Sequence, residues 1–188
     1  HGLDWRLIAA LSHTESRHDP WGIGEGGSAG LLQLMPATAR AFGVEDPFDP
    51  RQNVVAGARL LQWLSKVLRD TEPNDRLSFV LAAYNMGLGH VEDARGLAAS
   101  RDLDPNRWDG NVATVLPLME DPEIAQTLEH GRARGSFTLS YVERVLDRRA
   151  PPALVAGRLW HAMRPLDVDA MRAGAAMLLG HHDFTTFW

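Results

Sequence analysis

The amino-acid sequence predicts a mostly α-helical domain with a short helical C-terminal appendage. Apolar residues recur every three to four positions along most of the chain, which is the repeat of a helix face. No alternating run of apolar and polar residues is long enough to predict a strand. The 188 residues, 45% of them apolar and 23% charged, suffice for one sizeable hydrophobic core.

The first half of the chain is predicted to hold four helices and one glycine-rich loop. A helix over Leu3–Ser16 precedes the loop Gly22–Gly30, whose glycines allow positive φ angles. Pro36 marks a helix start, because proline is tolerated in the first turn. One apolar stripe predicts a helix over Asn53–Asp70, and the segment RLSFVLAAYNMG predicts a buried helix that ends at its glycine.

Shorter helices are predicted over the second half of the domain. HVEDARGLAAS suggests one or two helical turns, and DGNVATVLPLM, PEIAQTLEHGRARG and SFTLSYVERVLD suggest one helix each. The character of the sequence changes near residues 147–150, which predicts a domain of residues 1–147 and an appendage of residues 148–188. Within the appendage a helix is expected at about 167–179, capped by Asp167 and ended by Gly180.

Charge and composition exclude several classes of function. The 19 basic residues against 24 acidic ones give a net charge of -5, which argues against a nucleic-acid partner. The chain has no cysteine, hence no disulfide, and no apolar run long enough for direct membrane insertion. It begins at His1 without an initiator methionine or an apolar leader, so we expect a piece excised from a longer protein.

The first helix carries a carboxylate where a core residue is expected. Ile8, Leu11 and Glu15 fall on one side of this helix. Burial and the nearby helix C-terminus both disfavour the charged form of a carboxyl, so the pKa of Glu15 is expected to be raised. A raised pKa suits a general acid. Spacing alone leaves open a boundary residue paired with Arg17 or His18.

Four short motifs occur in order: ES at Glu15, GLLQLMP at Gly30–Pro36, AYN at Ala83–Asn85 and YVERV at Tyr141–Val145. With their flanking sequence they resemble the catalytic domain of lytic transglycosylases of the goose-lysozyme-like superfamily. VLAAYNMGLGHVEDAR, LPLM and HGRARG are most similar to the membrane-bound lytic murein transglycosylase F type. The resemblance implies a lysozyme-like helical domain over residues 1–147.

The resemblance also implies roles for individual residues. It makes Glu15 the catalytic acid and base, and it suggests substrate contacts for the following residues: Ser28, Gln33, Met35, Tyr84, Asn85 and Tyr141. Each of these has a plainer interpretation without the family. Gln33 and Met35 could pack a loop, Asn85 could end a helix, and Tyr141 could belong to the core.

The glycine-rich loop departs from the family pattern. Where the family has Ser-x-x-Gly-Ala-x-Gly-Leu-Met-Gln, this chain has Gly24 at the serine, Ser28 at the alanine and Leu32 at the methionine. Leucine for methionine is a mild change, since the two are apolar and similar in volume. The missing serine hydroxyl is expected to affect affinity or subsite preference.

The implied reaction is cleavage of the MurNAc-GlcNAc β-1,4 bond of peptidoglycan with formation of 1,6-anhydro-MurNAc. One glutamate acts first as acid and then as base, no cofactor is needed, and the partner is a glycan strand. The protein is then expected to be a monomer in the periplasm, associated with the outer membrane in its parent form. The alternatives are a lysozyme-like hydrolase on the same fold and a non-catalytic peptidoglycan-binding domain.

The appendage resembles a different family. Arg148–Phe187, beginning RRAPPAL and ending LLGHHDFTTF, is similar to an internal piece of tRNA pseudouridine synthase A. The Arg-Thr-Asp-Ala-Gly motif of that family is absent from the chain, so a chimera is expected. An RNA-binding role for the appendage is the least favoured alternative, because its charges balance. The adjacent His181 and His182 do not have the spacing of a metal site.

Overall fold

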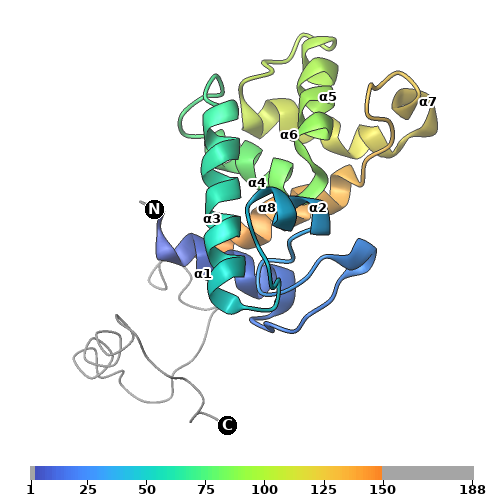
Figure 1. Ribbon diagram of the computed structural model, residues 1–188. Coiled ribbons are helices and arrows are strands. Elements are labelled where there is room, and N and C mark those ends of the chain that lie inside the picture. The colour runs from blue at the N-terminus through green and yellow to red at the C-terminus, as the bar shows by residue number, and fades with distance from the viewer. Residues whose placement is uncertain (1–2, 150–188) are drawn as a thin grey trace, which may run out of the picture. The chain divides into compact units, whose positions relative to one another are not determined.

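The structure, a computed structural model, describes residues 3–149 (Figure 1). These residues are mostly helical, and their extended segments form only isolated β-bridges, Ile23 to Ala29 and Ala29 to Leu34. The longer helices are α1 (Trp5–Ser16), α3 (Pro50–Val67), α4 (Arg76–Met86), α5 (Leu88–Ala99) and α8 (Gly135–Arg149). The shorter ones are η1 (Glu25–Gly27), α2 (Pro36–Ala41), η2 (Trp108–Val112), α6 (Ala113–Val115), η3 (Leu116–Glu120) and α7 (Pro122–Ala125).

Helix α4 forms the centre of the domain. Six consecutive residues, Ser78–Ala83, are buried all around the helix, which identifies it as a core helix. It packs against α3, α5 and α8, and α8 in turn packs against α1 (Figure 1). Phe79 is fully buried and meets Trp108 edge to face, with ring centroids 5.1 Å apart. This packing brings the C-terminal ends of α1 and α4 against α8.

Local sequence sets the helix ends. Asp4 and Asp49 accept hydrogen bonds from the first free N–H groups of α1 and α3, and Pro50 pre-sets φ in the first turn of α3. Arg17 ends α1 in the left-handed conformation, with φ 58°. Gly87, with φ 91°, separates α4 from α5, where a residue with a Cβ would be strained.

The predicted mostly helical class is confirmed, and several predicted boundaries were wrong. Helix α3 begins three residues before Asn53, because Asp49 and Pro50 supply a helix start. Helix α5 has 12 residues instead of one or two turns. Of the helix predicted from Pro122 to Gly135, only the four-residue α7 forms. The appendage predicted over 148–188, including its helix at 167–179, lies outside the described residues except for its first two positions.

Candidate active site

The end of α1 is fixed against the glycine-rich loop. Ser16 donates its hydroxyl to the carbonyl of Leu31 at 2.9 Å, and its side chain also lies 3.1 Å from the carbonyl of Ser12. Arg17 then turns the chain out of the helix. Glu15 therefore sits on the last turn of a helix whose end cannot swing freely, which is what a positioned acid requires.

Glu15 is partly buried and faces α8. The hydroxyl of Tyr141 donates a hydrogen bond to Glu15 Oε1 at 2.6 Å, across 126 residues of chain. Burial raises the pKa of Glu15 to about 7, and the hydrogen bond from Tyr141 offsets part of this rise. The alternative of a boundary residue paired with Arg17 or His18 finds no support: Arg17 is exposed and His18 lies 3.0 Å from the Ser12 hydroxyl.

Tyr84 has a different task from Tyr141. Its hydroxyl donates to the carbonyl of Leu32 at 2.7 Å, so it joins α4 to the loop. Burial raises the pKa of Tyr84 well above its ordinary value, and the charge of nearby Glu15 raises it further. The phenol thus stays neutral beside the carboxyl group. Tyr84 therefore lies near Glu15, while the substrate contact predicted for it stays a prediction.

Asn85, next to Tyr84, connects α4 to α8. Its Oδ1 accepts a hydrogen bond from the hydroxyl of Thr138 at 2.8 Å. No hydrogen bond within residues 3–149 takes up the NH2 group of Asn85, which leaves a donor available at the edge of the site. Thr138, a buried residue that the motifs did not single out, precedes Tyr141 by three positions on α8 and so shares its face.

Gln33 and Ser28 contact each other within the loop. Ser28 donates to Gln33 Oε1 at 2.8 Å, and Gln33 Nε2 donates to the carbonyls of Gly22 and Gly30 at 2.9 Å each. The backbone of Gln33 is left-handed, with φ 46°. Its amide therefore braces the loop. The sugar contacts predicted for Gln33 and Ser28 stay predictions, and the bracing is a role that the sequence did not indicate.

Met35 is the exposed member of the predicted set. Its side chain is 45% exposed and lies over Gly26, where an added Cβ would stand 3.3 Å from the methyl group. An exposed methionine beside the loop offers apolar contact to a ligand. Two further exposed apolar side chains on the same stretch of chain are Trp21 and Ile23.

Asn53 is a loop-bracing residue that sequence reasoning missed. It is fully buried on α3, accepts from the N–H of Leu32 at 2.8 Å, and donates to the carbonyls of Ala29 and Pro47. Its amide thus pairs the N–H of Leu32 and the carbonyl of Pro47, and it adds a second hydrogen bond to the carbonyl of Ala29, which also accepts from the N–H of Leu34. A polar residue on the apolar face of a helix was the available signal.

The sequence matches a known protein family and several of its members. Residues 1–105 match the family described as the transglycosylase SLT domain. The chain belongs to this family, as the four motifs predicted. It is 44% identical over 147 residues to the membrane-bound lytic murein transglycosylase F of Desulfosudis oleivorans, and 41% identical over 149 residues to that of Maricaulis maris. These matches cover 78% and 79% of this chain and 32% of each relative, so the chain spans about a third of their length.

A solved structure supports the fold. The 70 kDa soluble lytic transglycosylase of Escherichia coli matches 82% of this chain and 22% of its own, with a TM-score of 0.56 and 24% sequence identity. The predicted lysozyme-like transglycosylase fold is therefore confirmed. Among the described residues no helix has the length and apolarity needed to cross a bilayer. Nor does that part of the chain gather three or more potential metal ligands.

Proposed function

We propose that the domain is a peptidoglycan lytic transglycosylase in which Glu15 is the single acid and base. The observation that carries this proposal is the partly buried carboxyl of Glu15, whose pKa of about 7 leaves a large fraction protonated near neutral pH. The family and the printed names of the relatives support the substrate class. Tyr84, which lies near Glu15, its neighbour Asn85 and the exposed Met35 of the loop are candidate contacts for the sugars.

The reaction needs one proton delivered and one removed. Glu15 first donates its proton to the glycosidic oxygen, and the bond from that oxygen to C1 of MurNAc breaks. The N-acetyl oxygen of the same sugar stabilises the cationic C1. The ionised Glu15 then takes the proton from the C6 hydroxyl as O6 bonds to C1, which closes the 1,6-anhydro ring without consuming water.

The burial of Glu15 and its hydrogen bond from Tyr141 each favour one step of this cycle. Its hydroxyl donates to Glu15 Oε1 and therefore stabilises the ionised carboxylate that acts as base in the second step. Burial favours the protonated acid of the first step. The two effects oppose each other, and a pKa near the working pH is the result that general acid–base catalysis requires.

The test is mass spectrometry of the soluble products from purified peptidoglycan, using this chain and its Glu15→Gln variant. Anhydro-muropeptides from the parent and none from the variant are expected. Products heavier by one water, with reducing ends, would assign a hydrolase instead. Muropeptide binding without any product would assign a non-catalytic binding domain.

The same proposal places the protein in the cell. Peptidoglycan lies in the bacterial periplasm, and the two relatives are named as membrane-bound. We place the parent protein in the periplasm, associated with the outer membrane through parts of the chain beyond this domain. Fractionation of cells that produce the full-length protein, followed by detection of this domain, tests the location.

A further inference from the structure

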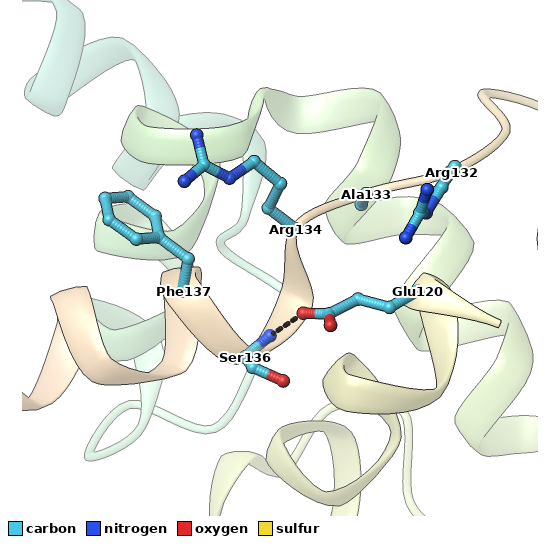
Figure 2. A pocket seen from close by; sticks show the side chains of 6 residues that line it. All are labelled: Glu120, Arg132, Ala133, Arg134, Ser136 and Phe137. Carbon is cyan, nitrogen blue, oxygen red and sulfur yellow. Dashed lines mark hydrogen bonds between the residues drawn. The ribbon is translucent and has the colours of Figure 1, made fainter.

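A hollow beside the start of α8 is not used by the acid–base mechanism (Figure 2). It has a volume of about 540 Å³ and is lined by Glu120, Arg132, Ala133, Arg134, Ser136 and Phe137. A second hollow of about 280 Å³ shares Arg132, Arg134 and Phe137 with the first and reaches Asn85 and Thr138. The two hollows together lead from the edge of the acid site to a pair of arginines.

The hollow adjoins the reacting centre along α8. Phe137 precedes Tyr141 by four residues, so the two lie on one face of the helix, one turn apart. Thr138, which follows Phe137, donates a hydrogen bond to Asn85, and Tyr141 donates one to Glu15. A group attached to a sugar bound at Glu15 would therefore have to extend about one helical turn to enter the hollow.

The charge of the hollow is positive on balance. Arg132 and Arg134 stand on either side of the buried Ala133. The guanidinium of Arg134 lies 4.6 Å from the ring centre of Phe137, and that of Arg144 lies 5.6 Å from it (Figure 2 shows Arg134 beside the ring).

Two carboxylates oppose these three arginines. Glu120 Oε1 is engaged by the backbone N–H of Ser136 at 2.7 Å, a hydrogen bond that holds the pKa of Glu120 below its usual value. Glu25 Oε2 lies 3.9 Å from Arg134, and both of these side chains are mostly exposed. An exposed pair at that distance binds weakly, so Arg134 can exchange Glu25 for a ligand.

We infer that this hollow binds a carboxylate of the peptide carried by muramic acid in the glycan strand. The inference rests on the proposed function, because it names a further part of the same substrate. Guanidinium groups pair with carboxylates through two parallel hydrogen bonds, and the 44%-exposed ring of Phe137 offers apolar contact to the carbon chain of the peptide. The sugar rings and N-acetyl groups of a peptide-bearing strand carry no charge, so the arginines select the peptide.

The experiment compares two forms of one substrate. Soluble peptide-bearing glycan oligomers are acetylated at their amino groups, and half of the material then has its carboxylates converted into amides. The parent chain should cleave the free-carboxylate form with a kcat/KM about 3- to 10-fold higher than the amidated form, the size expected for partly exposed charge pairs. Raised ionic strength should shrink this ratio.

The arginines are tested together and against matched variants. Arg132→Gln/Arg134→Gln should lower the ratio to about one, mainly through KM for the free-carboxylate form, while the amidated form is cleaved as by the parent. Arg132→Lys/Arg134→Lys keeps both charges and should retain part of the ratio. Arg59→Gln removes an exposed charge from α3, which contributes no residue to either hollow, and should leave the ratio unchanged.

The outcomes separate the two proposals. If the parent releases no product from either form, the proposed function fails. If it cleaves both forms equally well, or if the double Gln variant retains the full ratio, the peptide-binding inference is wrong and the transglycosylase stands. Equal loss on both substrate forms, in a variant whose thermal unfolding matches the parent, would assign the arginines to the glycan and also overturn the inference.

Discussion

The loop of residues 22–35 contacts the end of α1, which carries Glu15, and the hollow lies beside the start of α8, which carries Tyr141, yet the two regions use their polar groups in opposite ways. In the loop, Gln33 and Ser28 make their hydrogen bonds inside the protein, and buried Asn53 makes three more from α3. In the hollow, Arg132 and Arg134 lie at the surface with weak partners. Residues that hold the loop in place have their hydrogen-bonding groups paired within the protein, whereas the arginines of the hollow can still pair with a ligand.

Loss of the buried Asn53 side chain should have the largest effect on stability. Asn53→Ala removes three hydrogen bonds and leaves the N–H of Leu32 and the carbonyl of Pro47 without their partner, so it should lower the free energy of unfolding by about 3 to 4 kcal/mol. Urea unfolding measures this.

The controls for this variant are substitutions of residues whose polar groups are exposed. Asn111→Ala removes two local hydrogen bonds from an exposed turn and should cost less than about 1 kcal/mol. Arg132→Gln/Arg134→Gln should stay within about 0.5 kcal/mol of the parent. If the arginine variant lost as much free energy of unfolding as Asn53→Ala, the distinction between the loop-bracing residues and the hollow would be wrong.

Glu15 should reduce stability at alkaline pH. Its pKa rises from 4.5 when unfolded to about 7 when folded, so between these values the folded state holds more protons. The free energy of unfolding therefore falls as pH rises through this window, by at most about 3 kcal/mol. Glu15→Gln should be more stable than the parent at pH 8 by up to this amount and equal to it at pH 4. Equal stability of the two proteins at pH 8 would show that the carboxyl is not desolvated.

The two tyrosines should separate in their pH profiles. Tyr141→Phe removes the hydrogen bond that lowers the pKa of Glu15, so the alkaline limb of kcat/KM should move up by about one pH unit. Tyr84→Phe removes a hydrogen bond to the carbonyl of Leu32, so it should cost about 1 kcal/mol of stability without moving that limb. Equal shifts in the two variants would contradict the division of roles.

The smallest effect concerns the loop departure at Gly24 and Ser28. A Cβ at Gly24 would overlap Ser28 Oγ and Gln33 Oε1, although the extended backbone there tolerates a side chain. Gly24→Ser should therefore destabilise the parent more than it destabilises the Ser28→Ala variant, with a coupling of about 1 kcal/mol in a double-mutant cycle. Additive effects would mean that the two positions do not share one space.

The sequence predicted the helical class, the family and the neighbourhood of the acid from local patterns. The spacing of apolar residues that ends at Glu15 predicted the helix α1, and the glycine after α4 predicted where that helix ends. Both features depend on residues close together in the sequence. The helix predicted over residues 122–135 does not form beyond α7, which stops after four residues. Gly131 lies in the left-handed region with φ 77°, a conformation that interrupts a right-handed helix.

What the sequence by itself determined is which residues could carry the chemistry; only the tertiary structure decided which partner each of them meets. The sequence around Gln33 does not distinguish a glutamine that contacts a sugar from one that braces a loop. The bond from Tyr141 to Glu15 joins residues 126 positions apart, and Asn53 reaches the loop only after α3 packs against it. The physical reason is that a buried polar group takes whichever partner the packing leaves within hydrogen-bonding distance, and that partner is set by the whole fold.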